Sequence, residues 1–195
     1  MSPWTLRSMK GLSGRRMVGL DGDAGFIVEV YFDDKVWQVR YLVVDTENPM
    51  PRREVLVPCA SIETEQRTDD RVRVRLTRAQ IQQYPEKEAD PPVWYQHDLR
   101  RASNYQRAAL GDPHLRSSAI VIGYGVQTLD GRIGHIEDLL VSGTWRIAHL
   151  AIDTRNWLPG KRVLVAPNTV ERIDWVSREV HLSLTRAALR RSTPA

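Results

Sequence analysis

The residues best suited to acid–base or metal chemistry are histidines with carboxylates close by. His135 and Glu137 lie two positions apart, so both side chains would share one face of a strand, and His149 and Asp153 share a face in the next apolar stretch. Imidazole and carboxylate groups gathered in this way are ligands that zinc accepts. A metal site is therefore one hypothesis.

An internal repeat, described below, favours a structural interpretation of both histidines. His135 takes the position that Phe26 has in the first copy, and His149 takes that of Tyr41. A side chain that replaces an aromatic residue of the same fold most simply fills the aromatic position. We therefore predict structural or surface roles for both histidines, and no metal site.

Two other residue types could carry catalysis. Asp45 and Asp153, each followed by Thr, end long strand-like stretches in both copies; a catalytic carboxylate is conceivable, but we favour an acceptor for backbone N–H groups at a turn. Cys59 has no His or Cys partner at a motif spacing, so we expect an inert thiol. The sequence has no Gly-rich phosphate loop, HExxH, GxSxG or paired-Cys motif. We predict no catalytic residue, no cofactor and no enzyme activity.

Aromatic residues are the better candidates for a functional surface, because Trp and Tyr dominate the hot spots of protein interfaces. Trp157 follows Asp153 in a loop where the first copy has no Trp, and Trp94 and Tyr95 stand in the middle of the chain. Burial in a core is the alternative for each. We predict that Trp157, Trp94 and Tyr95 contact a partner.

The elements that must position these residues form two copies of one unit. Leu6-Arg7-Ser8 matches Leu115-Arg116-Ser117 at an offset of 109, and from Trp37, which matches Trp145, the offset is 108. Further matches at these offsets include Gly14, Leu20-Asp21-Gly22, Asp45-Thr46, Val55-Leu56-Val57 and Leu76-Thr77-Arg78-Ala79 of the first copy. The deletion falls at 33–36, where a hairpin tip absorbs it most easily.

Each copy has the pattern of a small β-structure. Residues 26–32 and 37–44 flank a polar tip and predict a hairpin, and Val72, Val74 and Leu76 alternate with arginines as in a strand with one buried face. Thr77 and Gln80 then fit a capping box at the start of a short helix. We predict a mainly all-β fold: two tandem small β-barrels of about six strands, each followed by a short helix.

The copies set the domain boundaries. We predict a first repeat at residues 1–82, a connector rich in Pro and charge at 83–114, and a second repeat at 115–195. Because Trp94 and Tyr95 are too apolar for a free linker, part of the connector is expected to pack on a barrel.

Charge and composition exclude several classes of protein. The 195 residues carry a net charge of +4, with +1 in 1–82, −1 in 83–114 and +4 in 115–195, and the arginines are scattered rather than clustered. We therefore do not expect nucleic acid as a partner. No apolar stretch reaches the ~20 residues of a membrane span, and the N-terminus lacks the pattern of a signal peptide. With a single cysteine, the sequence predicts a cytoplasmic protein without membrane insertion.

The order of these motifs resembles the PRC-barrel family over residues 6–82 and 115–190. The second copy is most similar, through Leu129-Asp130-Gly131, Gly134-His135-Ile136-Glu137-Asp138 and the stretch from Leu150 to Lys161. The resemblance implies a β-barrel module found in the photosynthetic reaction centre H subunit, in a ribosome maturation factor and in many bacterial proteins. In the first two settings the barrel serves protein contacts and assembly.

The expected function is that of a non-enzymatic protein-interaction or assembly module. The partner is a protein of unknown identity, and a homo-oligomer is also compatible with the pattern. An RNA- or ribosome-associated factor is the first alternative, and an enzyme of unknown reaction is the second. We also expect the two barrels to pack on each other or on a second chain, because a barrel of ~75 residues is marginal alone.

Overall fold

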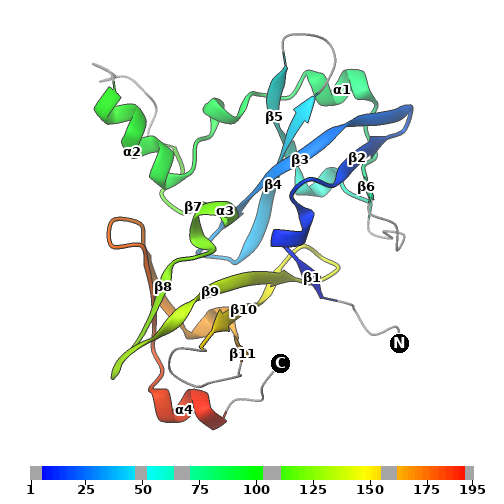
Figure 1. Ribbon diagram of the computed structural model, residues 1–195. Coiled ribbons are helices and arrows are strands. Elements are labelled where there is room, and N and C mark those ends of the chain that lie inside the picture. Colours follow the sequence, from blue (N-terminus) through cyan, green and yellow to red (C-terminus); the bar gives the residue numbers. More distant parts are fainter. Residues whose placement is uncertain (1–5, 47–51, 64–70, 103–110, 155–161, 192–195) are drawn as a thin grey trace. The chain divides into compact units, whose positions relative to one another are not determined.

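The computed structural model describes residues 6–46, 52–63, 71–102, 111–154 and 162–191. The chain is mainly β, with two sheets and a few short helices (Figure 1). This confirms the predicted class of fold.

The first sheet has six strands in the order β5-β4-β3-β2-β6, with β7 added on β3. All its neighbours are antiparallel except β2 and β6, which are parallel. Its strands are β2 (Arg16–Gly19), β3 (Gly22–Asp33), β4 (Gln38–Thr46), β5 (Arg53–Pro58), β6 (Arg71–Arg73) and β7 (Leu115–Ser117).

The second sheet has seven strands in the order β11-β10-β9-β8-β13-β12, with β1 added on β9. Its strands are β1 (Arg7–Ser8), β8 (Gly125–Thr128), β9 (Gly131–Val141), β10 (Ile147–Asp153), β11 (Arg162–Val165), β12 (Val170–Asp174) and β13 (Glu179–Leu182). The two sheets are similar because each contains a long hairpin, β3–β4 or β9–β10, and one parallel pair, β2–β6 or β8–β13. The similarity fits the internal repeat.

The alternating residues bury the faces that their pattern predicts. Val72 and Val74 in the first sheet and Val180 and Leu182 in the second are at most 1% exposed. The hairpin turns also correspond despite the one-residue deletion, since Trp37 and Trp145 both have positive φ, at 54° and 61°. A positive φ is uncommon for a residue with a side chain, so the same strained turn is kept in both copies.

Gly25 and Gly134 are needed where the two strands of each long hairpin approach each other closely. A Cβ atom on Gly25 would lie 2.1 Å from the carbonyl oxygen of Asp45, and one on Gly134 would lie 1.8 Å from that of Asp153. Both glycines have positive φ, at 131° and 157°. Any side chain at these positions would push the two strands apart.

The helices are short. They are α1 (Arg78–Gln82), α2 (Val93–Ala102), α3 (Ser118–Val121) and α4 (Arg186–Arg191), and the 3-10 turns are η1 (Lys10–Leu12), η2 (Cys59–Ser61), η3 (Lys87–Ala89) and η4 (Pro167–Thr169). Thr77 and Gln80 form the predicted capping box on α1. No helix in the described part of the chain is long and apolar enough to cross a membrane.

The chain divides into two compact units whose bounds differ from those of the repeats. The first unit is residues 11–117, and the second unit is residues 1–10 together with 118–195. The reason lies in the first strand of each repeat. Arg7 of β1 pairs with Val141 of β9, and Arg116 of β7 pairs with Phe32 of β3, so each strand completes the sheet of the other repeat. We call this arrangement the strand exchange.

The described pairings leave both sheets open. No pairing between described residues joins the two ends of either sheet, β5 with β6 or β11 with β12. Closure of each sheet into a barrel therefore stays a prediction. The connector predicted at 83–114 belongs to the first unit, where the Leu56 amide donates to the Pro85 carbonyl over 2.9 Å and Arg53 Nε pairs with Glu86 over 2.6 Å.

Candidate interaction site

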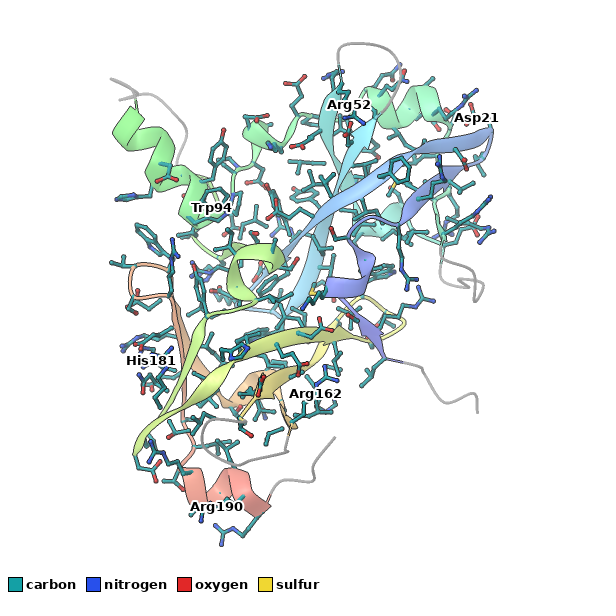
Figure 2. All side chains as sticks on the ribbon, in the orientation of Figure 1. Asp21, Arg52, Trp94, Arg162, His181 and Arg190 are labelled. Atoms are coloured by element: carbon teal, nitrogen blue, oxygen red, sulfur yellow. The ribbon has the colours of Figure 1, made fainter. Side chains whose placement is uncertain are left out.

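Two of the three predicted contact residues lie on α2 in the first unit, where Figure 2 labels Trp94. The rings of Trp94 and Tyr95 are 5.4 Å apart between centroids and are both half-buried. The indole nitrogen of Trp94 is buried and has no hydrogen-bond partner within the described residues. The third residue, Trp157, lies outside the described residues.

Gln96 fastens α2 to the segment that leads into β7. Its side-chain amide donates to the carbonyl oxygens of Pro91, over 2.8 Å, and Asp112, over 3.0 Å. The Asp112 carbonyl also accepts from the Leu115 amide over 3.2 Å, so it joins α2 to the start of β7. The position of the aromatic pair therefore depends on the chain near Asp112.

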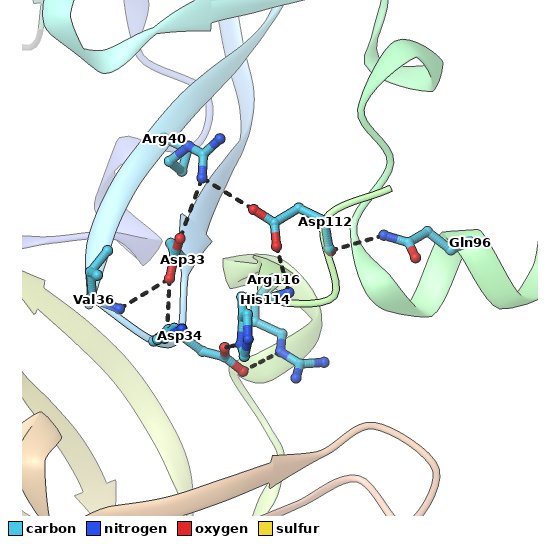
Figure 3. Close-up of polar contacts among 9 residues, drawn as sticks. Asp33, Asp34, Val36, Arg40, Gln96, Asp112, His114 and Arg116 are labelled. Atoms are coloured by element: carbon cyan, nitrogen blue, oxygen red, sulfur yellow. Dashed lines mark hydrogen bonds and ion pairs between the residues drawn. The ribbon is translucent and has the colours of Figure 1, made fainter. Parts of the chain in front are cut away.

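Asp34, at the tip of the β3–β4 hairpin, binds His114, just before β7, and Arg116, within β7, through three contacts (Figure 3). Its Oδ1 lies 2.8 Å from Nδ1 of His114, its Oδ2 accepts from Nε of Arg116 over 2.5 Å, and its amide donates to the His114 carbonyl over 3.0 Å. The side chains of Asp34 and Arg116 are 10% and 13% exposed. This buried ion pair holds β7 on β3.

A second set of contacts joins the same hairpin to Asp112. Asp33 accepts from the amides of Lys35 and Val36 over 2.8 and 3.0 Å, and Arg40 pairs with both Asp33 and Asp112 over 3.3 and 3.2 Å (Figure 3). Partial burial works to raise the pKa of Asp33, but the two amides and Arg40 outweigh it and hold the pKa below its ordinary value. Asp33 is therefore an anion that stiffens the turn.

The other end of β7 is held by Glu29. The hydroxyl of Ser117 donates to Oε1 of Glu29, and Tyr31 also hydrogen-bonds this carboxyl. Burial raises the pKa of Glu29, although these hydrogen bonds oppose the shift. Burial, with the nearby Glu29 charge, likewise raises the pKa of Tyr31. Polar groups thus fix both ends of a strand of only three residues.

This arrangement suits a structural tie better than catalysis. An Asp–His contact such as Asp34–His114 orients an imidazole in many hydrolases, but there the ring also contacts a nucleophile. Within the described residues, the hydrogen-bond and ion-pair partner of the His114 ring is Asp34, which is not a nucleophile. The carboxylates of Asp33, Asp34 and Asp112 each already bind a cation or backbone amides.

The histidines considered as metal ligands are separated by the fold. Nε2 of His135 lies 3.9 Å from Asp153 on the neighbouring strand, whereas Glu137 pairs with Arg162 over 3.0 Å. Nδ1 of His149 is buried without a hydrogen-bond partner in the described part of the chain. No group of three or more His, Cys, Asp or Glu among the described residues could hold a metal ion. That no metal or cofactor binds stays a prediction.

The sequence predicts a turn acceptor at Asp45 and an inert thiol at Cys59. Asp45 lies near the end of β4, where its Oδ2 is 3.6 Å from Arg52; residues 47–51, which follow this strand, lie outside the described residues, so its role at a turn stays a prediction. Burial raises the pKa of the Cys59 thiol to about 12. A neutral thiol at physiological pH agrees with the predicted inert residue.

Asp34, His114 and Arg116 were not identified from the sequence. The contacts join residues 80 and 82 positions apart, and no motif connects them. The available signal was the match of Leu115-Arg116-Ser117 to the start of the chain, which marks a repeated strand but not its partner.

Comparison with models of known protein families found no match to this chain, and comparison with curated proteins found none either.

Proposed function

We propose that this chain is a tandem PRC-barrel-type module that binds a protein partner and has no enzymatic activity. The observation that carries the proposal is the aromatic pair on α2, since Trp94 and Tyr95 are half-buried and stand on a helix fastened through Gln96. Rigid aromatic side chains with remaining exposed area are the usual anchors of a protein interface.

The contacts that the acidic residues already make support the same proposal. The carboxylates of Asp33, Asp34 and Asp112 are all used to tie hairpin to strand, which leaves none of them available as a general base. A site whose charges stabilise a fixed surface suits binding rather than turnover.

The barrel part of the proposal rests on the repeat. In both copies the chain after the fifth strand returns to pair with the last strand, through Ile62 and Val74 in the first copy and Val170 and Leu182 in the second. These pairs are equivalent at the offset of 108. Closure of the two sheets would remove exposed edges, as small barrels do.

Site-specific crosslinking tests the proposed interface. A photoreactive phenylalanine analogue at Tyr95 is expected to capture a discrete protein in the native cell, because that side chain lies at the proposed contact. The matched control carries the analogue at Val176, which is 73% exposed in the second unit.

A protein captured at Tyr95 and not at Val176, and lost when Trp94 is changed to Ala, supports the module. Capture that disappears after nuclease treatment would instead favour the RNA-associated alternative. No captured species at Tyr95 would contradict the proposal.

A further inference from the structure

The first unit has an open groove of about 500 Å³ beside the start of β2 and β6. It is lined by Gly11, Ser13 and Gly14 and by Arg15, Arg16, Phe26 and Arg71. We call it the arginine groove. None of these residues belongs to the candidate interaction site on α2 and β7, so the inference does not depend on the proposed function.

The fold itself brings the arginines together. Arg16 and Arg71 are direct partners in the parallel pairing of β2 with β6, and Arg15 precedes Arg16 in the chain. Like charges opposite each other on neighbouring strands destabilise a sheet. A bound anion would convert this repulsion into attraction.

Two of the guanidinium groups are held in place before any ligand arrives. Nε of Arg15 donates to the Gly11 carbonyl over 2.6 Å. The guanidinium of Arg16 stacks over the Phe26 ring at 4.4 Å and pairs with Asp23 over 3.2 Å. Groups that are already ordered lose less conformational entropy on binding.

The second repeat shows that the fold does not require these charges. At the equivalent positions it has Tyr124, Gly125 and Glu179 in place of the three arginines, and Gly125 and Glu179 are paired as Arg16 and Arg71 are. The backbone is kept while three cations are replaced, one of them by a carboxylate. The arginines of the first repeat are therefore an addition to the common structure.

The charges also indicate the class of ligand. Three guanidinium groups and the Asp23 carboxylate give the groove a net charge of +2, which balances a phosphate dianion, and guanidinium groups match phosphate oxygens in pairs. Residues 11–117 carry 16 Lys and Arg and 17 Asp and Glu, so the unit around the groove has a net charge of −1. This net negative charge around the groove favours a single phosphate over a long polyanion.

We propose that the arginine groove binds the phosphoryl group of a small phosphorylated molecule. The test is a titration of the full chain, followed by amide NMR at constant ionic strength and about pH 8, where phosphate is mainly the dianion. Inorganic phosphate, glycerol phosphate, acetate and a single-stranded oligonucleotide are the probes.

Saturable shifts of residues 11–16 and 71 are expected with both phosphate compounds but not with acetate. Arg71→Gln should weaken phosphate binding at least tenfold, and Arg15→Gln provides a second variant that leaves the strand pair intact. Arg191→Gln, at an exposed position of α4, is the control and should bind as the unmodified chain does.

Because Arg71→Gln removes a like-charge pair, its Tm without phosphate should be unchanged or higher. Equal responses to phosphate and acetate, or phosphate binding that survives both substitutions, would overturn the proposal. An oligonucleotide that binds more than tenfold tighter than phosphate, with a steep salt dependence, would also overturn it, in favour of nucleic acid.

Discussion

At the scale of single residues, Asp34 and Glu29 matter most because each holds one end of β7. Asp34 supplies the carboxylate that Arg116 and His114 contact, and Glu29 accepts from Ser117. Asp34 forms an ion pair with the largely buried Arg116, whereas burial raises the pKa of Glu29. The two residues are therefore expected to respond differently to substitution.

Asp34→Asn should lower the free energy of unfolding by about 1.5–3 kcal/mol, the range for hydrogen bonds to charged groups. The loss is expected because NH1 of Arg116 is already buried without a partner in the described part of the chain, and Asp34 is the acceptor of its Nε. Urea unfolding measures the effect. Glu137→Gln, which breaks the exposed pair with Arg162, should cost only about 0–1 kcal/mol, and equal losses would contradict a buried tie.

Glu29→Gln should raise stability at neutral pH and flatten its dependence on pH. Burial raises the pKa of Glu29 above its ordinary value of 4.5, so the folded chain keeps a proton that the unfolded chain releases. The stability from this group is complete below about pH 4.5 and declines as the pH rises through the raised pKa. Urea unfolding between about pH 4.5 and neutral pH measures this loss of stability. The loss should appear in the unmodified chain and in the exposed control Glu171→Gln, but not in Glu29→Gln.

At the scale of elements, the aspartate of each Asp-Gly turn binds the first turn of the helix at the end of the same repeat. The Arg78 amide donates to Asp21 and the Arg186 amide donates to Asp130, both over 2.8 Å. These hydrogen bonds lower the pKa of both aspartates. The turn residues thus act as distant caps, in addition to the Thr at each N-cap.

Thr77→Ala should destabilise the protein by about 1 kcal/mol, and Thr185→Ala should do so by less. The Thr77 hydroxyl accepts from the Gln80 amide and donates to the Gln80 side chain, both over 3.2 Å, whereas the Thr185 hydroxyl accepts from the Ala188 amide, over 3.3 Å. Chemical unfolding of the two variants, side by side, measures the difference. A larger effect at Thr185 would show that the second hydrogen bond of the Thr77 hydroxyl contributes nothing.

At the scale of the whole molecule, the strand exchange makes each unit depend on both repeats. Ser8 pairs with Leu140, and its equivalent Ser117 pairs with Tyr31. The registers of the two pairings are equivalent at the offset of 109. Pairing of each strand within its own repeat would have the same register, so a crosslink is the measurement that separates the two arrangements.

Cysteine crosslinking distinguishes the two arrangements. With Cys59 changed to Ser, the double variant Ser8→Cys/Leu140→Cys should form an intrachain disulfide on mild oxidation, because these residues are direct partners across β1 and β9. The matched variant Ser117→Cys/Leu140→Cys should not, because Ser117 is paired with Tyr31. Non-reducing electrophoresis and mass spectrometry give the readout, and the reverse pattern would refute the exchange.

The sequence by itself determined the parts of this protein that depend on local pattern. Alternation at Val72 and Val74 gave a half-buried strand, and Thr77 with Gln80 gave the capping box, because these features need only neighbours a few positions away. The internal match likewise predicted two similar sheets, since equal side-chain patterns bury equal faces.

The tertiary structure alone decided what lies next to what. The two repeated Leu-Arg-Ser strands have the same pattern, so nothing local says which copy of the long hairpin each strand joins. The Asp34–Arg116 tie and the meeting of Arg16 with Arg71 follow from that pairing of distant strands. Interactions of this kind depend on register and topology, which are properties of the whole chain, and they place the charges that the sequence shows only as scattered residues.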